Sequence, residues 1–596
     1  EAAWAPTSKE VSLAMPEVNH SDLERPLLSL GLFFLNVIFF PLLAATLLFM
    51  VGISVSPLHF PIAVIAAAAV SFLPRKQSWR QAVLTALIGL AILAFCILLS
   101  GYVEDWSWDG NSYHKGITGA LCWGWNPLRE SFFQFAEPFP FLEHCTATWY
   151  DAYPKASELF AACVHSFTRN IEAGKAFNLL SIAALFFLSW GMLTHSGLLK
   201  HWQSVICAGL LVLTPVNTSQ IFTYYNDGFL ANVLLLCLIG LLYFTLYPQG
   251  ALRPLAGYSI FVSINLGFNI KFSATLFFAV LCLTFFGCWV VRDFRGRSFA
   301  QGVRAVRGRF LLLAASVISG VLLLGSTSYV TNTIRYHNPF YTMIGPGSTE
   351  IITSQLPYVF RPMNHPARFV ASLFSRTNTS LEMPAVEWKL PFTFTFGEFY
   401  NSAACDVRTA GWGVFFSGIL LVSAAVIAVS LIRCRRSRPE IFRLTLVLSV
   451  MLAVSVLFIP GLCWARYFTA LFYIPVAALL FLFVWWNREK GRGKLICAIL
   501  ITALLCFDMA PNAGCALILL KDAHLTWEQL DRLKACTETG EVILGYGPPS
   551  SFEGRMFGIR DAGITNYTFG EIDPEDYTDT VYQRYRLYYK VIQEEN

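Results

Sequence analysis

The chain has 596 residues, of which 55% are hydrophobic and 14% are charged, and its formal net charge is +5. A soluble globular protein carries roughly 25% charged residues, so this composition excludes a chain that faces water on all sides. The small positive charge comes with no basic face or nucleic-acid-binding motif, and no nucleic-acid partner is expected.

Hydrophobic segments recur along the chain at lengths that suit a bilayer. A membrane-spanning helix needs about 20 predominantly apolar residues. Thirteen segments come close to that length, namely 27–52, 57–74, 81–101, 176–195, 203–221, 228–247, 254–271, 273–291, 310–330, 411–432, 441–460, 466–486 and 494–519. The match is poorest at 57–74, at 203–221 and in the closely spaced pair 254–271 and 273–291. We predict a polytopic α-helical membrane protein with about 13 transmembrane helices between residues 27 and 519.

Basic residues in the short loops indicate how the chain is oriented, because Lys and Arg concentrate on the cytoplasmic side. Four basic clusters separate predicted spans, at 75–80, 292–309, 433–443 and 488–494. If residues 1–26 form a cytoplasmic N-terminal segment, thirteen crossings place all four clusters in the cytoplasm. The loops 102–175 and 331–410 then lie outside, in the periplasm, the extracellular space or an organelle lumen.

The C-terminal region, residues 520–596, changes to a composition rich in Asp, Glu, Tyr and Gly. Glu541–Gly545 resembles a short buried strand, and Thr526–Leu533 fits a separately capped amphipathic helix. We predict a small α/β cap domain outside the cytoplasm, docked on the membrane body.

An acidic stretch follows the third predicted span, where the chain leaves the membrane. It contains Glu104, Asp105 and Asp109, with Tyr113 and His114 just beyond. Carboxylates this close raise one another's pKa, which suits a general base or a metal ligand. The alternative is a solvated acidic loop beside an interfacial aromatic belt.

Five further polar residues lie on the predicted outer side. Asp227 precedes an apolar helix, where it could belong to a site or cap the helix. Lys271 lies between two spans and could either extend to the interface or bind a phosphate. Arg466, together with Arg335 and His337, opposes the usual cytoplasmic bias of basic residues. Arg suits bidentate phosphate recognition, so these groups together fit a site for an amphiphile that carries a phosphate.

The order of these features resembles the glycosyltransferase C superfamily, in particular bacterial relatives of protein O-mannosyltransferases and lipid A aminoarabinose transferases. The resemblance covers most of residues 81–470. It rests on Trp108–His114, Tyr153-Pro154 with Glu158 and Asn178, Pro215–Asp227, Lys271, Asn338–Tyr341 and Ala465–Tyr467. Two features depart from the family's usual pattern. The family usually has its acidic loop directly after the first span, whereas here two further predicted spans come first. The family's loop acids often form a closer acid-x-acid pair, whereas Asp105 and Asp109 are four residues apart.

The resemblance implies an inverting glycosyltransferase that uses a polyprenyl-phosphate-linked sugar outside the cytoplasm. Asp109 would be the catalytic base that deprotonates a glycolipid, polysaccharide or protein acceptor. The implied substrate-binding residues are Asp105, Tyr113, His114, Asp227, Lys271, Arg335, His337 and Arg466. A divalent metal such as Mg²⁺ or Mn²⁺, held by Asp105 and Asp227, is a further option. The expected location is a bacterial inner membrane, with the active site on the periplasmic side.

Three other interpretations remain open at this stage. A transporter or flippase would carry charges near the bilayer midplane and helices broken in paired positions. A glycan polymerase or ligase would rely on Arg and His and would not need Asp109. A structural or receptor membrane protein would use the C-terminal region for binding.

Cys122 and Cys145 share the first predicted outer loop and could form a disulfide.

Overall fold

The computed structural model describes residues 23–73, 78–139, 142, 145, 148–345, 348, 354–459, 461–545, 554–570, 572–573, 577–582 and 587–592. Most of the predicted N-terminal segment 1–26 lies outside these described residues. The same is true of Arg75 and Lys76 in the first basic cluster.

Long apolar helices dominate the described part of the chain, where ten are long and apolar enough to cross a membrane. They are α1 (Glu24–Met50), α3 (Trp79–Tyr102), η3 with α8 (Ile171–His195), α11 (Asp227–Leu246), α13 (Phe272–Phe294), α14 with η4 and η5 (Phe299–Thr327), α19 (Phe416–Ser437), α20 (Pro439–Phe458), η7 with α21 (Thr469–Glu489) and α22 (Arg492–Thr539). The chain is therefore an integral, multi-pass helical membrane protein.

Three other predicted spans are helical but are not among these ten: α2 (His59–Phe72), α9 (His201–Val212) and α12 (Arg253–Ile270). The predicted span 203–221 is broken because a new helix, α10 (Pro215–Gln220), begins directly after α9. Thr214 caps α10 by accepting a hydrogen bond from the backbone N–H of Asn217, and Pro215 suits its first turn. The total of thirteen crossings therefore stays a prediction.

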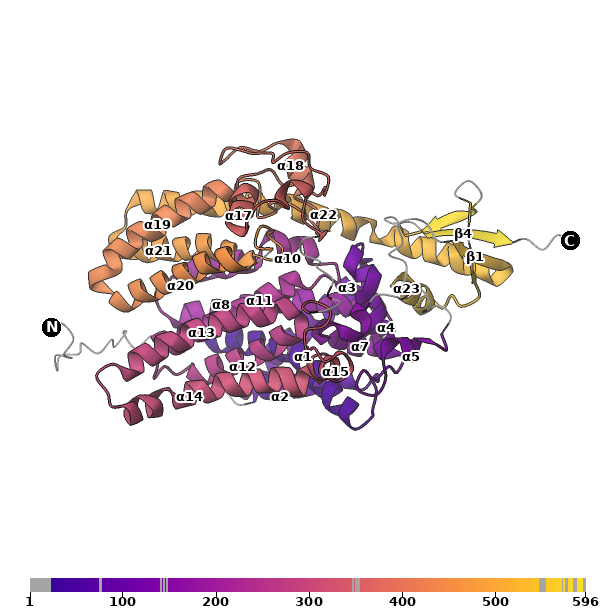
Figure 1. Cartoon of the computed structure of the whole chain (residues 1–596), viewed down its shortest axis with the longest axis horizontal. Helices are drawn as coiled ribbons and strands as arrows, with labels where there is room; N and C mark the ends of the chain where they lie inside the picture. Colours follow the sequence, from indigo (N-terminus) through magenta and orange to yellow (C-terminus); the bar gives the residue numbers. More distant parts are fainter. Residues whose placement is uncertain are drawn as a thin grey trace.

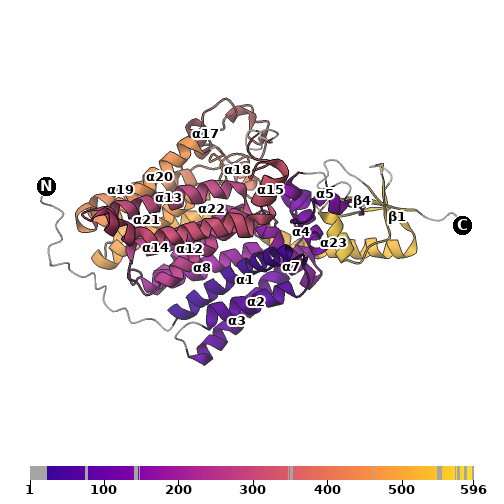
Figure 2. The ribbon, with the colours of Figure 1, turned by 60° about the horizontal axis from the view of Figure 1, so that its bottom comes forward.

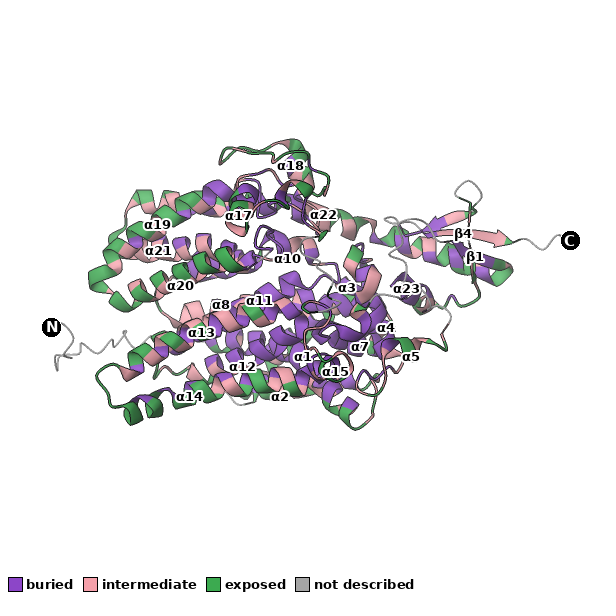
Figure 3. Cartoon of the chain, in the orientation of Figure 1, coloured by how far each residue is buried: buried purple, intermediate pink, exposed green. Residues whose placement is uncertain are grey.

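Burial is very uneven across the bundle. Helix α1 lies at the centre and packs against α8 and α2, and most of its residues are buried. None of the residues of α20, all of which belong to the described part, is buried. Figure 3 shows this contrast, with α20 green and pink and α7 (Ala156–Thr168) purple. Exposed apolar side chains of this kind suit contact with lipid.

The turn between α13 and α14 and the turn between α19 and α20 lie at the same end of the bundle (Figure 1). These turns carry parts of the second and third basic clusters. The C-terminal strands lie at the opposite end, as Figure 2 also shows. A shared end for these clusters agrees with the predicted orientation, which itself stays a prediction.

Both long outer loops contain short helices. The first loop holds η1 (Gly110–His114), α4 (Lys115–Cys122), α5 (Phe132–Ala136), α6 (Trp149–Ala152) and α7 (Ala156–Thr168). The second holds α15 (Tyr329–Tyr336), η6 (Tyr358–Phe360), α17 (His365–Leu373) and α18 (Phe396–Asn401). The first loop is part of the core, because residues 159–164 of α7 are fully buried and α7 contacts α4, η3 and α1.

Helix α22 extends without a break into the C-terminal region, so the segment 526–533 is helical as expected, but the cap expected at Thr526 is wrong. Thr526 lies inside α22, and its hydroxyl donates to Glu104 Oε2 at 3.1 Å. The expected strand Glu541–Gly545 is confirmed as β1. It lies in a four-stranded sheet of order β2-β1-β4-β3, with β2 (Thr568–Gly570), β3 (Asp579–Val581) and β4 (Leu587–Ile592). The pair β1–β2 is parallel and the other pairs are antiparallel.

The C-terminal region is attached to the first outer loop through α23 (Arg555–Asp561). Asp561 Oδ1 lies 2.9 Å from His165 Nε2, and Asp561 Oδ2 accepts the backbone N–H of Ile171 at 2.7 Å. Arg555 Nη2 donates to Glu104 Oε1 at 3.4 Å. Burial alone would lower the pKa of His165, but Asp561 first and Cys122 second outweigh it and raise that pKa to about 10. His165 is therefore a cation at neutral pH.

This ion pair gives a pH-dependent prediction. His165 is protonated in the folded and unfolded states below its ordinary pKa of about 6.5, so the pair contributes fully there. Its contribution is lost as the pH rises through about 10. Asp561→Asn should lower the free energy of unfolding by about 2 kcal/mol near pH 6 and by much less above pH 10. Thermal unfolding in detergent across this pH range measures the difference.

Asp579→Asn is the matched control, because Asp579 pairs with Arg532 where both side chains are exposed. An exposed pair contributes little, so this variant should melt close to wild type. An Asp561→Asn defect that stayed constant from pH 6 to pH 10.5 would contradict the role given to His165.

Candidate functional site

The guanidinium of Arg466 is surrounded by three carboxylates. Its Nε donates to Asp227 Oδ2 at 2.7 Å, its Nη1 to Asp406 Oδ1 at 2.6 Å, and its Nη2 to Asp109 Oδ2 at 2.9 Å. The Arg466 side chain is only 8% exposed. Burial alone would lower its pKa, but Asp227, first among its acidic neighbours, raises the pKa well above the ordinary value. Arg466 is thus a permanent buried cation.

Asp109 lies seven residues after the end of α3 and immediately before η1. The turn before it is fixed by Asn111, whose amide donates to the backbone oxygens of Asp105 and Ser107. Gly110 is required in this turn, because a Cβ there would lie 1.9 Å from Asp105 Oδ2. The Asp109 side chain keeps 24% exposure, so solvent or a ligand can reach it.

Asp227 is the first residue of α11, yet its side chain does not cap that helix. The N-cap is Asn226, which makes no side-chain cap bond. Asp227 Oδ1 instead accepts from Lys271 Nζ at 2.7 Å, and Oδ2 accepts from Arg466 and from Gln220. The alternative of a simple helix cap is therefore wrong for Asp227.

Lys271 lies in extended backbone between α12 and α13, and its ammonium is held over the ring of Tyr467 at 4.7 Å. Burial alone would lower the pKa of Lys271, but Asp227 outweighs it and raises the pKa above the ordinary value. A lysine that extended to the interface would keep its charge in water. Lys271 is instead a partly buried cation, 14% exposed, that pairs with Asp227.

Asp406, in the second outer loop, was not identified from the sequence. Besides Arg466, its carboxylate accepts from Arg408 Nη2 at 2.8 Å. No motif marks the position, and the one available signal was an acid followed two residues later by an arginine in an outer loop. Three carboxylates (Asp109, Asp227, Asp406) and three cations (Lys271, Arg408, Arg466) therefore form one balanced cluster, the Arg466 cluster.

Tyrosines form a wall around the cluster. The guanidinium of Arg466 lies 4.3 Å from the ring centre of Tyr225 and 5.5 Å from that of Tyr467. Tyr113 and Tyr153 pack against each other, with ring centres 6.1 Å apart. Burial raises the pKa of both of these phenols, so they are neutral hydrogen-bonding groups.

Four predicted site residues are not bonded to the Arg466 cluster. Asp105 is fully buried and accepts the backbone N–H of Ser107 and of Tyr224, so it supports the loop. The remaining three lie elsewhere: His114 bonds Glu158 at 2.5 Å, Arg335 bonds Asp151 at 3.2 Å, and His337 ends α15 with a φ of 55°. Sequence alone could not separate these from the cluster members.

The residues present do not fit the expected metal pair. Both oxygens of Asp105 accept backbone N–H groups, and both oxygens of Asp227 accept from cations. Neither carboxylate offers an unoccupied oxygen, so no step is assigned to a metal held by this pair. No disulfide joins Cys122 and Cys145 in the described part of the chain.

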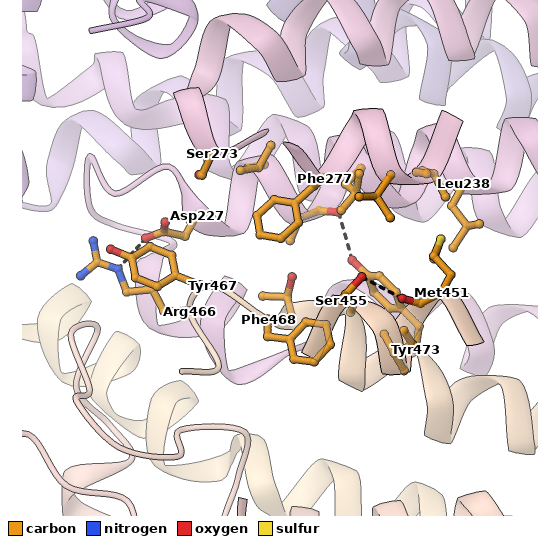
Figure 4. A pocket seen from close by; sticks show the side chains of 18 residues that line it. Asp227, Leu238, Ser273, Phe277, Met451, Ser455, Arg466, Tyr467, Phe468 and Tyr473 are labelled. Atoms are coloured by element: carbon orange, nitrogen blue, oxygen red, sulfur yellow. Dashed lines mark hydrogen bonds and ion pairs between the residues drawn. The ribbon is translucent and has the colours of Figure 1, made fainter. Parts of the chain in front are cut away.

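An apolar cavity ends at the Arg466 cluster (Figure 4). Counting its open mouth, its volume is about 820 Å³. Its walls come from α11, α13, α20 and the chain from Arg466 to Tyr473, and they include Leu234, Phe277, Met451 and Leu452. Asp227 and Arg466 supply the charged end. The cavity therefore has a mainly apolar lining and charged residues at one end.

Compared with models of known protein families, with curated proteins and with solved structures, the chain shows no match.

Proposed function

We propose that the protein is an inverting glycosyltransferase that moves a sugar from a polyprenyl-phosphate donor to an acceptor on the non-cytoplasmic face of the membrane. The observation that carries this proposal is the apolar cavity among membrane helices that ends at Arg466 and Asp227. A prenyl chain needs an apolar channel, and its phosphate needs cations at one end of that channel.

Lys271 and Arg466 are the groups that would stabilise the departing phosphate. Arg466 is buried at the charged end of the cavity, and Lys271 is partly buried beside it, paired with Asp227. Cations that are fixed before the reaction stabilise developing negative charge more effectively in a water-poor site than in water. The rings of Tyr225 and Tyr467 lie against the Arg466 guanidinium and cover part of it.

Asp109 is the proposed general base. In the reaction, an acceptor O–H or N–H attacks the anomeric carbon and forms the new glycosidic bond. The bond from that carbon to the phosphate oxygen breaks, and the prenyl phosphate leaves. The acceptor proton passes to the Asp109 carboxylate, which is partly exposed and is held in place at Oδ2 by Arg466. Attack from the side opposite the phosphate inverts the configuration.

The acceptor in this proposal is a glycolipid, a polysaccharide or a protein, and a bacterial inner membrane remains the expected location. The described charges gather at the outer ends of helices, beside the long loops. A transporter is a poorer fit, because its charges would be expected near the bilayer midplane. An acid-independent ligase is distinguished by Asp109, which it would not need.

Loss of the Asp109 carboxylate should slow sugar transfer. Asp109→Asn keeps the shape of the side chain and removes its basicity, so sugar transfer should fall by about 10²- to 10⁴-fold. Transfer of radiolabelled sugar from a polyprenyl-phosphate donor measures the rate. Asp109→Asn should remain folded, with a thermal unfolding transition close to that of the wild type. Glu137→Gln, at an exposed position in the same loop, is the control and should keep its rate. A wild-type rate in Asp109→Asn would favour the acid-independent ligase.

The second prediction concerns Lys271. Lys271→Gln removes a cation and leaves Asp227 paired with Arg466 alone, so kcat/KM for the donor should fall by about 10- to 100-fold. Lys271→Arg keeps the charge and should recover part of this loss. Equal losses in the two variants would mean that the charge at this position is not what the donor recognises.

The third prediction concerns the cavity. Leu452→Trp, on α20, places a bulky ring in the cavity wall and should raise the KM for a long-chain donor by about tenfold. Leu446→Trp is the matched control, because Leu446 lies on the same helix, is exposed and does not line the cavity. The two variants should therefore be equally stable and differ in KM. Identical kinetics would argue against a donor chain in this cavity.

A further inference from the structure

The carboxylate of Asp406 bridges two arginines. Asp406 Oδ1 accepts from Arg466 Nη1 at 2.6 Å, and Asp406 Oδ2 accepts from Arg408 Nη2 at 2.8 Å. Each oxygen of one anionic group thus meets a different guanidinium. A phosphate can present two of its oxygens to two arginines in the same way.

The backbone fixes the segments that carry the two arginines relative to each other. Ala410 forms a bridge with Trp464, and the N–H of Ala465 donates to the oxygen of Ala410 at 3.0 Å. The N–H of Arg408 donates to the oxygen of Asn378 at 2.8 Å. The position between the two guanidiniums is therefore built by the fold before any ligand arrives.

Asp406 is the most replaceable of the three acids around Arg466. Asp227 is 2% exposed and has three side-chain partners. Asp109 is held by the ordered turn that leads into η1. Asp406 lies in irregular backbone between α18 and α19 and is 23% exposed. Its side chain can thus turn towards solvent with the smallest change in the surrounding structure.

Charge also favours exchange over simple addition. The Arg466 cluster already balances three carboxylates with three cations. A phosphate added beside all three carboxylates would meet uncompensated repulsion at short range. A phosphate that takes the place of one carboxylate leaves two cations facing it, at a point that Arg466 shares with the apolar cavity.

We propose that the Asp406 carboxylate occupies a phosphate-binding position between Arg466 and Arg408, and that the phosphate of a prenyl-phosphate ligand exchanges with it. Arg408 thereby becomes a phosphate-binding residue, and Asp406 becomes an internal competitor that sets the affinity. Only the lipid nature of the ligand rests on the proposed function. The anion position itself rests on the two arginines and the carboxylate between them.

The test measures binding rather than transfer. Farnesyl phosphate, farnesol and inorganic phosphate are titrated by calorimetry into the purified full chain in detergent. Asp406→Asn should bind farnesyl phosphate about tenfold more tightly than wild type, because the internal competitor has lost its charge. Arg408→Gln should weaken that binding at least about fivefold, and farnesol should bind equally well to all variants.

Two control variants separate exchange at Asp406 from a general loss of negative charge. Asp109→Asn removes a carboxylate that also contacts Arg466 and is equally exposed, and it should gain less than about threefold. Glu387→Gln removes an exposed carboxylate elsewhere in the same loop and should change nothing. An Asp109→Asn gain as large as that of Asp406→Asn would overturn the proposal, as would unchanged or weaker binding in a folded Asp406→Asn protein.

The same titrations identify the source of the phosphate. A gain for farnesyl phosphate that exceeds the gain for inorganic phosphate supports a lipid ligand, whereas a gain for inorganic phosphate alone overturns the lipid assignment. If Asp406→Asn does not fold, Arg408→Gln tests the same position from the cation side, and wild-type affinity there overturns the proposal. Sugar transfer is not needed for any of these readings. If Asp406→Asn binds farnesyl phosphate more tightly but the wild-type protein transfers no sugar, the proposed function is contradicted and the exchange at Asp406 is still supported.

Discussion

A guanidinium buried beside membrane-spanning helices has to be neutralised where it lies, because moving a charge out of water is costly unless it is paired and hydrogen-bonded. Arg466 imposes this requirement on three distant parts of the chain. The residue before η1 is Asp109, the start of α11 provides Asp227, and the loop between α18 and α19 provides Asp406. This end of the bundle is organised around that convergence.

A second buried network supports the acidic turn that presents Asp109. The carboxylate of Glu172 lies between the ammonium groups of Lys115 and Lys175, and it also accepts the backbone N–H of Asp105 at 2.9 Å. All three side chains are at most 9% exposed. Asp105 therefore stabilises the backbone turn that carries Asp109. Like Asp109, it is an acid of the first outer loop, but the two have different surroundings and different roles.

The helices that line the cavity differ strongly in burial. Helix α11 forms one wall and has buried residues along most of its length, whereas α20 forms another wall and has none. A helix that exposes apolar side chains so widely is in contact with lipid when the protein is in a bilayer. The cavity thus lies between the protein core and the lipid phase, which suits a ligand that is itself a lipid.

Much of the architecture follows from hydrophobic length alone. Spans such as 27–52 and 228–247 were predictable because a helix in lipid must satisfy its own backbone and present about 20 apolar residues. The broken segment at 203–221 carried its own signal in Thr214-Pro215, which starts a new helix. By contrast, no local pattern predicts that Thr526 lies inside α22 and bonds Glu104, more than 400 residues earlier in the chain.

The sequence by itself determined that acids and bases of opposite sign lie at the predicted outer ends of helices, and Asp109, Asp227, Lys271 and Arg466 were identified on that ground. Tertiary structure alone decided which of these charges meet. Asp105 has the same side chain as the three acids of the cluster but accepts backbone N–H groups, and His114, predicted for the same site, is bonded to Glu158. Asp406 joins the cluster from 60 positions away from Arg466. Pairing of buried charges depends on distances of a few ångströms between segments far apart in the chain, and those distances are set by packing.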